Sequence, residues 1–359
     1  MKWLDDRAIG RLRTAADEPD LTGTSYRLIR KIGAGGMSTV YLAEDLKLGR
    51  KVAVKVMSLA DERGELKQRM LREAQIVARL EHPGIVPIHD VGTLPDGRVF
   101  YAMKYIQGRR LDQYAMSGRS VVDLLRVFQR VCEAVAFAHS FGVIHRDLKP
   151  ENIMVGSFGE VLVMDWGVAK LLGDRHGDPG EEAIGADDDA GTLIQRLAVP
   201  GEMETAYGVV VGTPAYMAPE QALGENQNLD KRADVYALGA ILYFLLTGRP
   251  PFDSATAAEV RSRLLEEGPA PPRRVNHLVA RPLEAVCLKA MSRDPRGRYE
   301  SAQELELEIA AFLSALPVSA YRENIVERTW RLITRNRFLV ILIVVYLIVR
   351  LLLLFFMGR

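Results

Sequence analysis

Two short segments carry the residue types that phosphoryl transfer needs. Residues 145–152 read His-Arg-Asp-Leu-Lys-Pro-Glu-Asn, and Asp165 begins an Asp-Trp-Gly turn after one short hairpin. Together they place a proton acceptor, a cation and two oxygen ligands for a metal ion within about twenty residues. Moving a phosphoryl group from a nucleotide to an alcohol requires positioning, and cations against the charge on the phosphate oxygens, but little covalent help. The two segments predict that chemistry.

A glycine-rich turn and a strand lysine lie upstream of these segments. Residues 33–38 read Gly-Ala-Gly-Gly-Met-Ser, and positions without side chains let backbone N–H groups come close to phosphate oxygens. Taken alone the turn is weak evidence, because most glycine-rich hairpins are only turns. The stretch Val-Ala-Val-Lys then ends at Lys55, and Glu73 follows on a predicted helix. The order and spacing of these residues favour a nucleotide site over scattered surface charge.

The character of the predicted elements changes once along the chain, at about residues 106–108. Before this boundary the pattern is strand-like with one main helix, and after it helices dominate up to about residue 316. The predicted strands cover 26–32, 39–44, 51–57 and 99–105, and the predicted helices include 65–80, 121–142, a buried helix at 237–246 and one opened by a capping box at 301–304. The predicted fold class is α+β, with a small β-rich lobe followed by a larger α-rich lobe.

The segment 145–152 and the Asp-Trp-Gly turn closely resemble the catalytic loop and the metal-binding turn of eukaryotic-type (Hanks-type) Ser/Thr protein kinases. The resemblance covers about residues 26–313 and is closest to the membrane-anchored bacterial kinases of this type. It implies the bilobal protein kinase fold, with an N-lobe at 26–106 and a C-lobe at 107–316. It also implies ATP and Mg²⁺ as cofactors, with Mn²⁺ as a substitute, and proteins with Ser or Thr acceptors as partners.

The resemblance gives each matching position a role. Asp147 aligns the substrate hydroxyl or accepts its proton, while Lys149 neutralises the transferring phosphate. Lys55 meets the nucleotide phosphates, and Glu73 orients Lys55. The implied metal ligands are Asn152 and Asp165, and the implied nucleotide site comprises Ile32, Gly33, Gly35, Val40, Ala53, Lys55, Met103 and Tyr105.

Some positions depart from the family pattern, and others extend the match. Ser38 replaces the third glycine of the phosphate loop, and Trp166 replaces a Phe, which bears on the balance between active and inactive states. Residues 212–220 resemble the substrate-positioning loop that ends in Ala-Pro-Glu, which implies a protein as the acceptor. Three further matches have structural roles in the family: Glu220, Arg298 and Asp234.

The segment 165–220 matches the activation segment of the family and holds an acidic insertion at 173–204. In the family, an Arg at the position of Arg146 receives a phosphate on this segment and orders it through charge-assisted hydrogen bonds. We expect Thr205 to be the phosphate acceptor, with Thr192 second. Thr213 also belongs to the expected regulatory positions.

The segment 338–357 is apolar almost throughout, with Arg350 as its single charge. At about 1.5 Å per residue it would span roughly 30 Å, the thickness of a bilayer core. The arginines in the basic juxtamembrane segment 317–337 place the globular part on the cytoplasmic side of the inner (plasma) membrane. The sequence therefore predicts a single-pass membrane protein in contact with the lipid bilayer. A buried or dimerising tail is the alternative, and a homodimer is among the expected partners.

The composition of the whole chain excludes several classes of function. With 47 Lys and Arg against 46 Asp and Glu the net charge is +1, so no nucleic-acid partner is expected. Cys132 and Cys287 each lie in an apolar helical pattern, which indicates buried free thiols in a reducing compartment. Residues 1–25 form an N-terminal extension that lacks the apolar core of a signal peptide.

Two other functions would suit the same fold. A pseudokinase would bind nucleotide and act as a scaffold, and Trp166 is the residue that keeps this alternative open. The catalytic and metal-binding positions that disfavour it are all intact: Lys55, Glu73, Asp147, Asn152 and Asp165. A small-molecule phosphotransferase is disfavoured by Lys149 and by the Ala-Pro-Glu loop.

Overall fold

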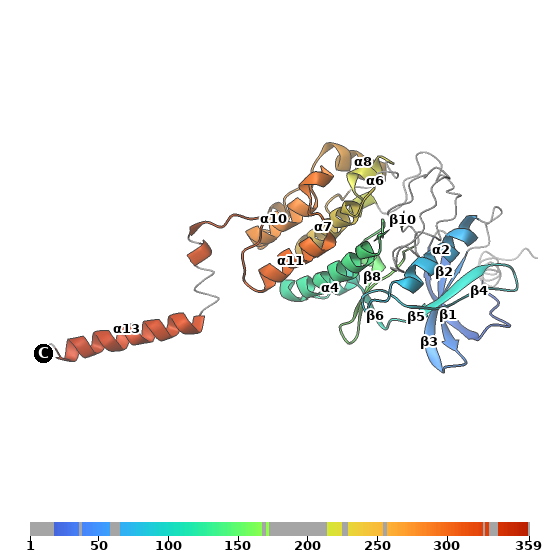
Figure 1. Cartoon of the computed structure of the whole chain (residues 1–359), viewed down its shortest axis with the longest axis horizontal. Helices are drawn as coiled ribbons and strands as arrows, with labels where there is room; N and C mark the ends of the chain where they lie inside the picture. The colour runs from blue at the N-terminus through green and yellow to red at the C-terminus, as the bar shows by residue number, and fades with distance from the viewer. Residues whose placement is uncertain are drawn as a thin grey trace, which may run out of the picture.

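The structure is a computed structural model that describes residues 18–35, 38–57, 65–166, 170–171, 214–224, 229–253, 257–325, 327–329 and 337–357. Apart from the C-terminal helix, the described residues form two lobes of different make-up (Figure 1). Strands dominate the first lobe and helices dominate the second. The predicted α+β class, with a β-rich lobe before a helical lobe, is therefore confirmed.

The first lobe is built on an antiparallel sheet with the strand order β1-β2-β3-β5-β4. Its strands are β1 (Tyr26–Ala34), β2 (Ser38–Asp45), β3 (Arg50–Met57), β4 (Ile88–Thr93) and β5 (Val99–Lys104). Successive side chains on β3 and β5 point to opposite faces, and both faces are packed. Val52, Val54 and Phe100 enter one core, whereas Val99 and Tyr101 enter another.

Helix α2 (Glu65–Arg79) packs beside this sheet, next to β4 and β5 (Figure 1). Its residues Met70 and Ala74 are buried in the same core as Tyr101, as the helical spacing of apolar residues predicts. The helix ends before His82, whose Nδ1 accepts a hydrogen bond from the Gly84 N–H at 3.0 Å. Glu73 is next to Ala74 and is itself buried, so α2 brings its carboxylate to the sheet.

The second lobe contains helices, 3₁₀ turns and short strands. Its helices are α3 (Leu111–Ala115), α4 (Val121–Ser140), α6 (Pro219–Ala222), α7 (Arg232–Thr247), α8 (Ala257–Glu266), α9 (Pro272–Val275), α10 (Arg281–Ala290) and α11 (Ala302–Leu313). The 3₁₀ turns are η1 (Pro150–Asn152), η2 (Pro214–Tyr216) and η4 (Pro295–Gly297). The strands are β6 (Gly108–Arg110), β7 (Val143–Ile144), β8 (Ile153–Gly156), β9 (Val161–Val163) and β10 (Lys170–Leu171), paired in the orders β6-β8-β9 and β10-β7.

Helix α7 lies at the centre of the second lobe. Every residue from Ala233 to Leu246 is buried, which confirms the prediction of a buried helix at 237–246. Helices α4, α10 and α11 pack against it. Gly248 ends α7 with a φ of 74°, a left-handed conformation that glycine adopts without a Cβ clash. The start of this helix accepts hydrogen bonds from the N–H groups of His145 and Arg146.

The chain remains in contact with the second lobe after α11. Val318 is buried, and the Ser319 N–H donates to the Glu308 carboxylate at 2.9 Å. Helix α13 (Arg337–Met357) is the last described element, and its side chains from Ile341 to Arg350 are exposed. Among the residues that the structure describes, no helix has both the length and the apolar character that a membrane span requires.

Candidate active site

The register of the sheet places the nucleotide-site candidates of the first lobe in neighbouring rows. Gly33 on β1 pairs with Val40 on β2, and Val40 pairs with Lys55 on β3. Ala53 and Met103, two positions further along β3 and β5, pair with each other. Because side chains alternate along a strand, Ala53 and Met103 lie on the same face of the sheet as Lys55. The register thus gathers residues that the sequence analysis assigned separately.

The ammonium of Lys55 bridges two carboxylates from different parts of the chain. Its Nζ lies 2.9 Å from Glu73 Oε1 on α2 and 2.9 Å from Asp165 Oδ1, which follows β9. Glu73 is buried and the Lys55 side chain is 12% exposed, whereas the Asp165 side chain is 50% exposed. The bridge joins a strand, a helix and a turn that lie far apart in the sequence.

The charges of this bridge reinforce one another. Burial works against the ammonium, but the acidic groups around it outweigh burial and hold the pKa of Lys55 well above its ordinary value. Burial also works against the carboxylate of Asp165, but the charge and hydrogen bond of Lys55 outweigh it and lower the pKa of Asp165. Both groups are therefore charged at neutral pH, which is the state that binding a metal–phosphate group requires.

The catalytic loop brings Asp147, Lys149 and Asn152 into contact. Lys149 Nζ lies 2.8 Å from Asp147 Oδ2. The Asn152 amide group donates to the Asp147 main-chain oxygen at 2.8 Å and to Asp147 Oδ2 at 3.2 Å. Asn152 sits at the end of η1, where the turn buries it. These bonds use the Asn152 amide nitrogen, so the side-chain oxygen of Asn152 is the atom that a metal ion would bind.

Asp234 on α7 holds the catalytic loop in place. Its carboxylate accepts hydrogen bonds from the His145 N–H at 2.8 Å and the Arg146 N–H at 2.9 Å. The ring Nε2 of His139 lies 2.8 Å from the same carboxylate. Burial opposes the charge, but these hydrogen bonds outweigh it and lower the pKa of Asp234. Arg146 has a φ of 68°, an unusual left-handed conformation that this anchoring sustains.

The β8–β9 hairpin returns the chain to the catalytic loop at Asp165. His145 Nε2 hydrogen-bonds the main-chain oxygen of Met164 at 3.0 Å, and the His145 and Trp166 rings lie 4.6 Å apart. Trp166 is buried, and its Nε1 donates weakly to the Val163 oxygen at 3.4 Å. Asp165 has a φ of 63°, so the chain turns sharply there and directs the carboxylate back to Lys55.

The donor set suits Mg²⁺ bound with a nucleotide. One carboxylate, Asp165, and one amide oxygen, Asn152, are hard oxygen ligands of the kind Mg²⁺ prefers, with phosphates and water completing its shell. Among the described residues, no group of three or more His, Cys, Asp or Glu side chains forms a complete metal cage.

The remaining nucleotide-site candidates of the first lobe lie on β1, β2, β3 and β5 or directly after β1. Ala53 is buried, Val40 and Met103 are half-buried, and Ile32 is exposed. The Gly35 N–H donates to the Ser38 oxygen at 2.8 Å, which closes the glycine-rich turn. Gly36, Met37 and Gly167 lie outside the described residues.

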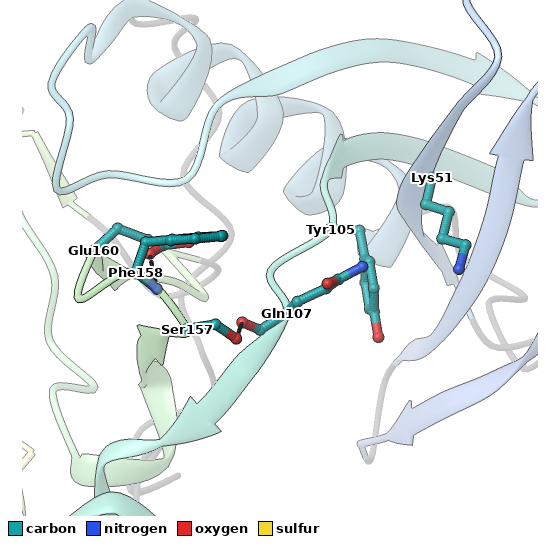
Figure 2. A pocket seen from close by; sticks show the side chains of 6 residues that line it. All are labelled: Lys51, Tyr105, Gln107, Ser157, Phe158 and Glu160. Carbon is teal, nitrogen blue, oxygen red and sulfur yellow. Dashed lines mark hydrogen bonds between the residues drawn. The ribbon is translucent and has the colours of Figure 1, made fainter.

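A separate hollow of about 380 Å³ lies beside the connection between the lobes (Figure 2). The ring of Tyr105, whose backbone was predicted to meet a nucleotide base, lines this hollow. The other lining residues are Lys51, Gln107, Ser157, Phe158 and Glu160. The residues of the Lys55 bridge and of the catalytic loop do not line it.

Two of the three structural candidates, Glu220 and Arg298, form an ion pair in the second lobe. Arg298 Nη1 and Nη2 contact the two carboxylate oxygens of Glu220 at 2.6 and 2.8 Å. The guanidinium also donates to the main-chain oxygens of Ser292 and Arg232 at 2.7 and 2.9 Å. Thr192, Thr205 and Thr213, with the insertion 173–204, lie outside the described residues.

Two contacting residues were not among the predicted site positions. His145 is buried and ties the catalytic loop to Met164, and its place at the head of the motif is the signal that points to it. Tyr101 donates a hydrogen bond to Glu73. Alternation along β5 puts Tyr101 on the same face as Met103, and this was the available signal.

Comparison with known proteins agrees with the fold. The family model described as "Protein kinase domain" matches residues 26–306. The chain therefore belongs to the protein kinase family.

Curated relatives of this chain are named as Ser/Thr protein kinases. Over 80% of its own length, the chain is 38% identical to the serine/threonine-protein kinase PknD of Protochlamydia amoebophila. It is 36% identical to PknB of Mycolicibacterium smegmatis over 81% and 39% identical to Pkn1 of Myxococcus xanthus over 82%. The matched regions cover 30%, 43% and 38% of these relatives, so the chain spans less than half of their length.

Proposed function

We propose that this protein is a protein kinase that transfers the γ-phosphate of ATP to Ser or Thr hydroxyls of proteins. The observation that carries the proposal is the bridge from Lys55 to Glu73 and Asp165, at 2.9 Å on each side. A pseudokinase that serves only as a scaffold would not need this bridge. It would also not need Asp147 and Asn152 to be intact. The names of the curated relatives support the same activity.

The side chains divide the work of phosphoryl transfer. ATP with Mg²⁺, when bound, supplies the phosphoryl group and neutralises part of its charge. Asp147 orients the acceptor hydroxyl and takes its proton, and Lys149, 2.8 Å from Asp147, balances negative charge beside it. Asn152 and Asp165 would hold the metal ion, and Lys55 would meet the nucleotide phosphates. Glu73 keeps Lys55 in position.

The acceptor class and the regulation are tested with one labelling experiment. We expect purified protein, incubated with Mg²⁺ and γ-labelled ATP, to yield phosphoserine and phosphothreonine, with Thr205 among its own modified positions. Label only on tyrosine, or on small molecules alone, would contradict the proposed acceptor class. Thr205→Ala should lower turnover of a protein substrate severalfold, since a phosphate at that position would pair with Arg146. Unchanged turnover, with no phosphate at Thr205 by mass spectrometry, would reject this regulatory role.

A membrane location belongs to the same proposal. Its support is the sequence alone: residues 338–357 are apolar except for Arg350, would span about 30 Å at 1.5 Å per residue, and follow several arginines. Arg350 lies in the second half of this helix and can reach toward an interface, which lowers its cost in a bilayer. We propose a single-pass anchor with the two lobes on the cytoplasmic side.

A further inference from the structure

Tyr101 stands directly opposite Lys55 in the sheet. The two residues are paired in the antiparallel register of β3 and β5, so their side chains leave the same face as close neighbours. Lys55 Nζ lies 5.5 Å from the centre of the Tyr101 ring. The tyrosine is 3% exposed, and it packs with Met70 and Ala74 of α2. Its position is therefore fixed by the sheet and by the helix.

The Tyr101 hydroxyl and the Lys55 ammonium converge on one oxygen atom. The hydroxyl donates to Glu73 Oε1 at 2.8 Å, and Lys55 Nζ lies 2.9 Å from the same atom. The Glu73 side chain is only 6% exposed. A carboxylate so far from water depends on hydrogen-bond donors from the protein, and each one lost leaves it with an unmet desolvation cost.

The hydroxyl of Tyr101 is always a donor under physiological conditions. Burial, together with the nearby Glu73 carboxylate, raises the pKa of Tyr101 far above its ordinary value, against the opposite effect of Lys55. A neutral hydroxyl can donate to Glu73 without competing with Lys55 for its negative charge. It also links β5 to α2 by a polar contact, in addition to the apolar packing between them.

We propose that Tyr101 is a positioning residue for phosphoryl transfer, which holds Glu73 at the distance and angle that keep Lys55 directed at the nucleotide. Tyr101 acts through Glu73 and does not touch the reacting groups. The proposal rests on the proposed function, because it assigns a role within the same site. It goes beyond that function in naming a side chain outside the motifs.

The test compares Tyr101→Phe with Tyr299→Phe in the full chain. Phenylalanine preserves the ring packing and removes only the hydroxyl. The Tyr299 hydroxyl is buried with no hydrogen-bond partner among the described residues, so it controls for the loss of a buried hydroxyl. We expect kcat/KM for ATP to fall about tenfold in Tyr101→Phe, the size of one hydrogen bond to a charged group, and to stay within about twofold in Tyr299→Phe.

A second background separates positioning from packing. In Glu73→Ala, where the acceptor is gone, adding Tyr101→Phe should reduce the residual kcat/KM by less than about twofold. If the tenfold loss persists in that background, Tyr101 acts by another route and the proposal is overturned.

Hydrogen exchange without nucleotide gives an independent readout. Amides of α2 should exchange about tenfold faster in Tyr101→Phe than in wild type, while those of β1 and β2 stay unchanged. Wild-type exchange in α2 would overturn the proposal, as would faster exchange throughout the sheet. If the wild-type protein transferred no phosphate, the proposed function would fail, but the exchange comparison would still decide the role of Tyr101.

Discussion

Lys55 is the residue on which the candidate site depends most. It contacts Glu73 from α2 and Asp165 from the turn after β9, so one ammonium connects both lobes. A buried cation with two carboxylates is costly to assemble, and it is stable here because each charge has a partner. The same arrangement directs the ammonium at the place where nucleotide phosphates are proposed to bind.

Replacement of Lys55 tests whether its ammonium has a specific role in phosphate transfer, beyond that of an ordinary surface lysine. We expect Lys55→Met to lower the rate of phosphate transfer by at least about 100-fold, because a preorganised cation at the phosphate is lost. Lys51→Met is the matched control: Lys51 is on the same strand and face, but it lines the other hollow. Radiolabelled transfer to a protein substrate measures both. Equal losses in the two variants would show that position 55 has no special role.

The motif residues were predictable from sequence, whereas their supporting contacts were not. Asp147, Lys149, Asn152 and Asp165 occur in one dense pattern, and its resemblance to the catalytic loop and metal-binding turn of protein kinases implies phosphoryl transfer. Tyr101 lies in an apolar strand where an aromatic residue is normally explained by packing. Only the register, which sets it opposite Lys55, reveals that its hydroxyl reaches Glu73.

At the scale of elements, buried polar contacts fix the second lobe around α7. Asp234 in the first turn of α7 accepts both N–H groups at the head of the catalytic loop. Arg298 joins η4 to the start of α6 through Glu220 and stacks over the Tyr236 ring at 5.0 Å. These contacts make the catalytic loop and the Ala-Pro-Glu loop parts of one rigid unit.

Two neighbouring arginines allow a matched test of this unit. The Arg298 side chain is fully buried, and we expect Arg298→Ala to lower the free energy of unfolding by about 3–5 kcal/mol, because Glu220 would lose its partner. Arg296 forms an exposed pair with Asp294, so Arg296→Ala should cost less than about 1 kcal/mol. Urea unfolding measures both. A cost for Arg298→Ala no larger than that for Arg296→Ala would contradict the account.

The long elements followed from periodicity, and the short ones did not. The apolar pattern of α4 predicted its bounds to within two residues, whereas that of α7 predicted only its part from 237 to 246 and missed its first turn. Strand β4 was not predicted, because it is an edge strand with mostly exposed side chains and contains Asp90 and Gly92. The capping box at α11 is half present: Ser301 Oγ accepts from the Glu304 N–H, but the Glu304 carboxylate accepts from the Glu300 N–H.

At the scale of the whole molecule, the proposed phosphoryl transfer requires residues from both lobes. The first lobe supplies Lys55 and Glu73, and the second supplies Asp147, Asn152 and Asp165. Composition and charge predicted a globular chain without a nucleic-acid partner. They could not predict which residues the segment after α11 would contact within the chain. Contacts such as that of Ser319 with Glu308 join distant residues and have no sequence signature.

The proposed membrane anchor is tested by fractionation. We expect the full chain to sediment with bacterial membranes and to resist extraction by high salt, since an apolar helix and not surface charge would hold it. Deletion of 337–357 should release the protein to the soluble fraction with its kinase activity retained. Recovery of the full chain in the soluble fraction without detergent would contradict the anchor.

The most direct test of the whole account is phosphate transfer from ATP by the wild-type protein and by Asp147→Asn. The substitution keeps the size of the side chain and removes its ability to take the proton of the acceptor hydroxyl. Asp294→Asn, an exposed Asp-to-Asn change far along the chain, is the control. We expect Mg²⁺-dependent phosphate transfer to Ser or Thr by the wild-type protein and by Asp294→Asn. We expect the rate of Asp147→Asn to be at least about 100-fold lower. An inactive wild type, or an Asp147→Asn variant as fast as wild type, would contradict the account.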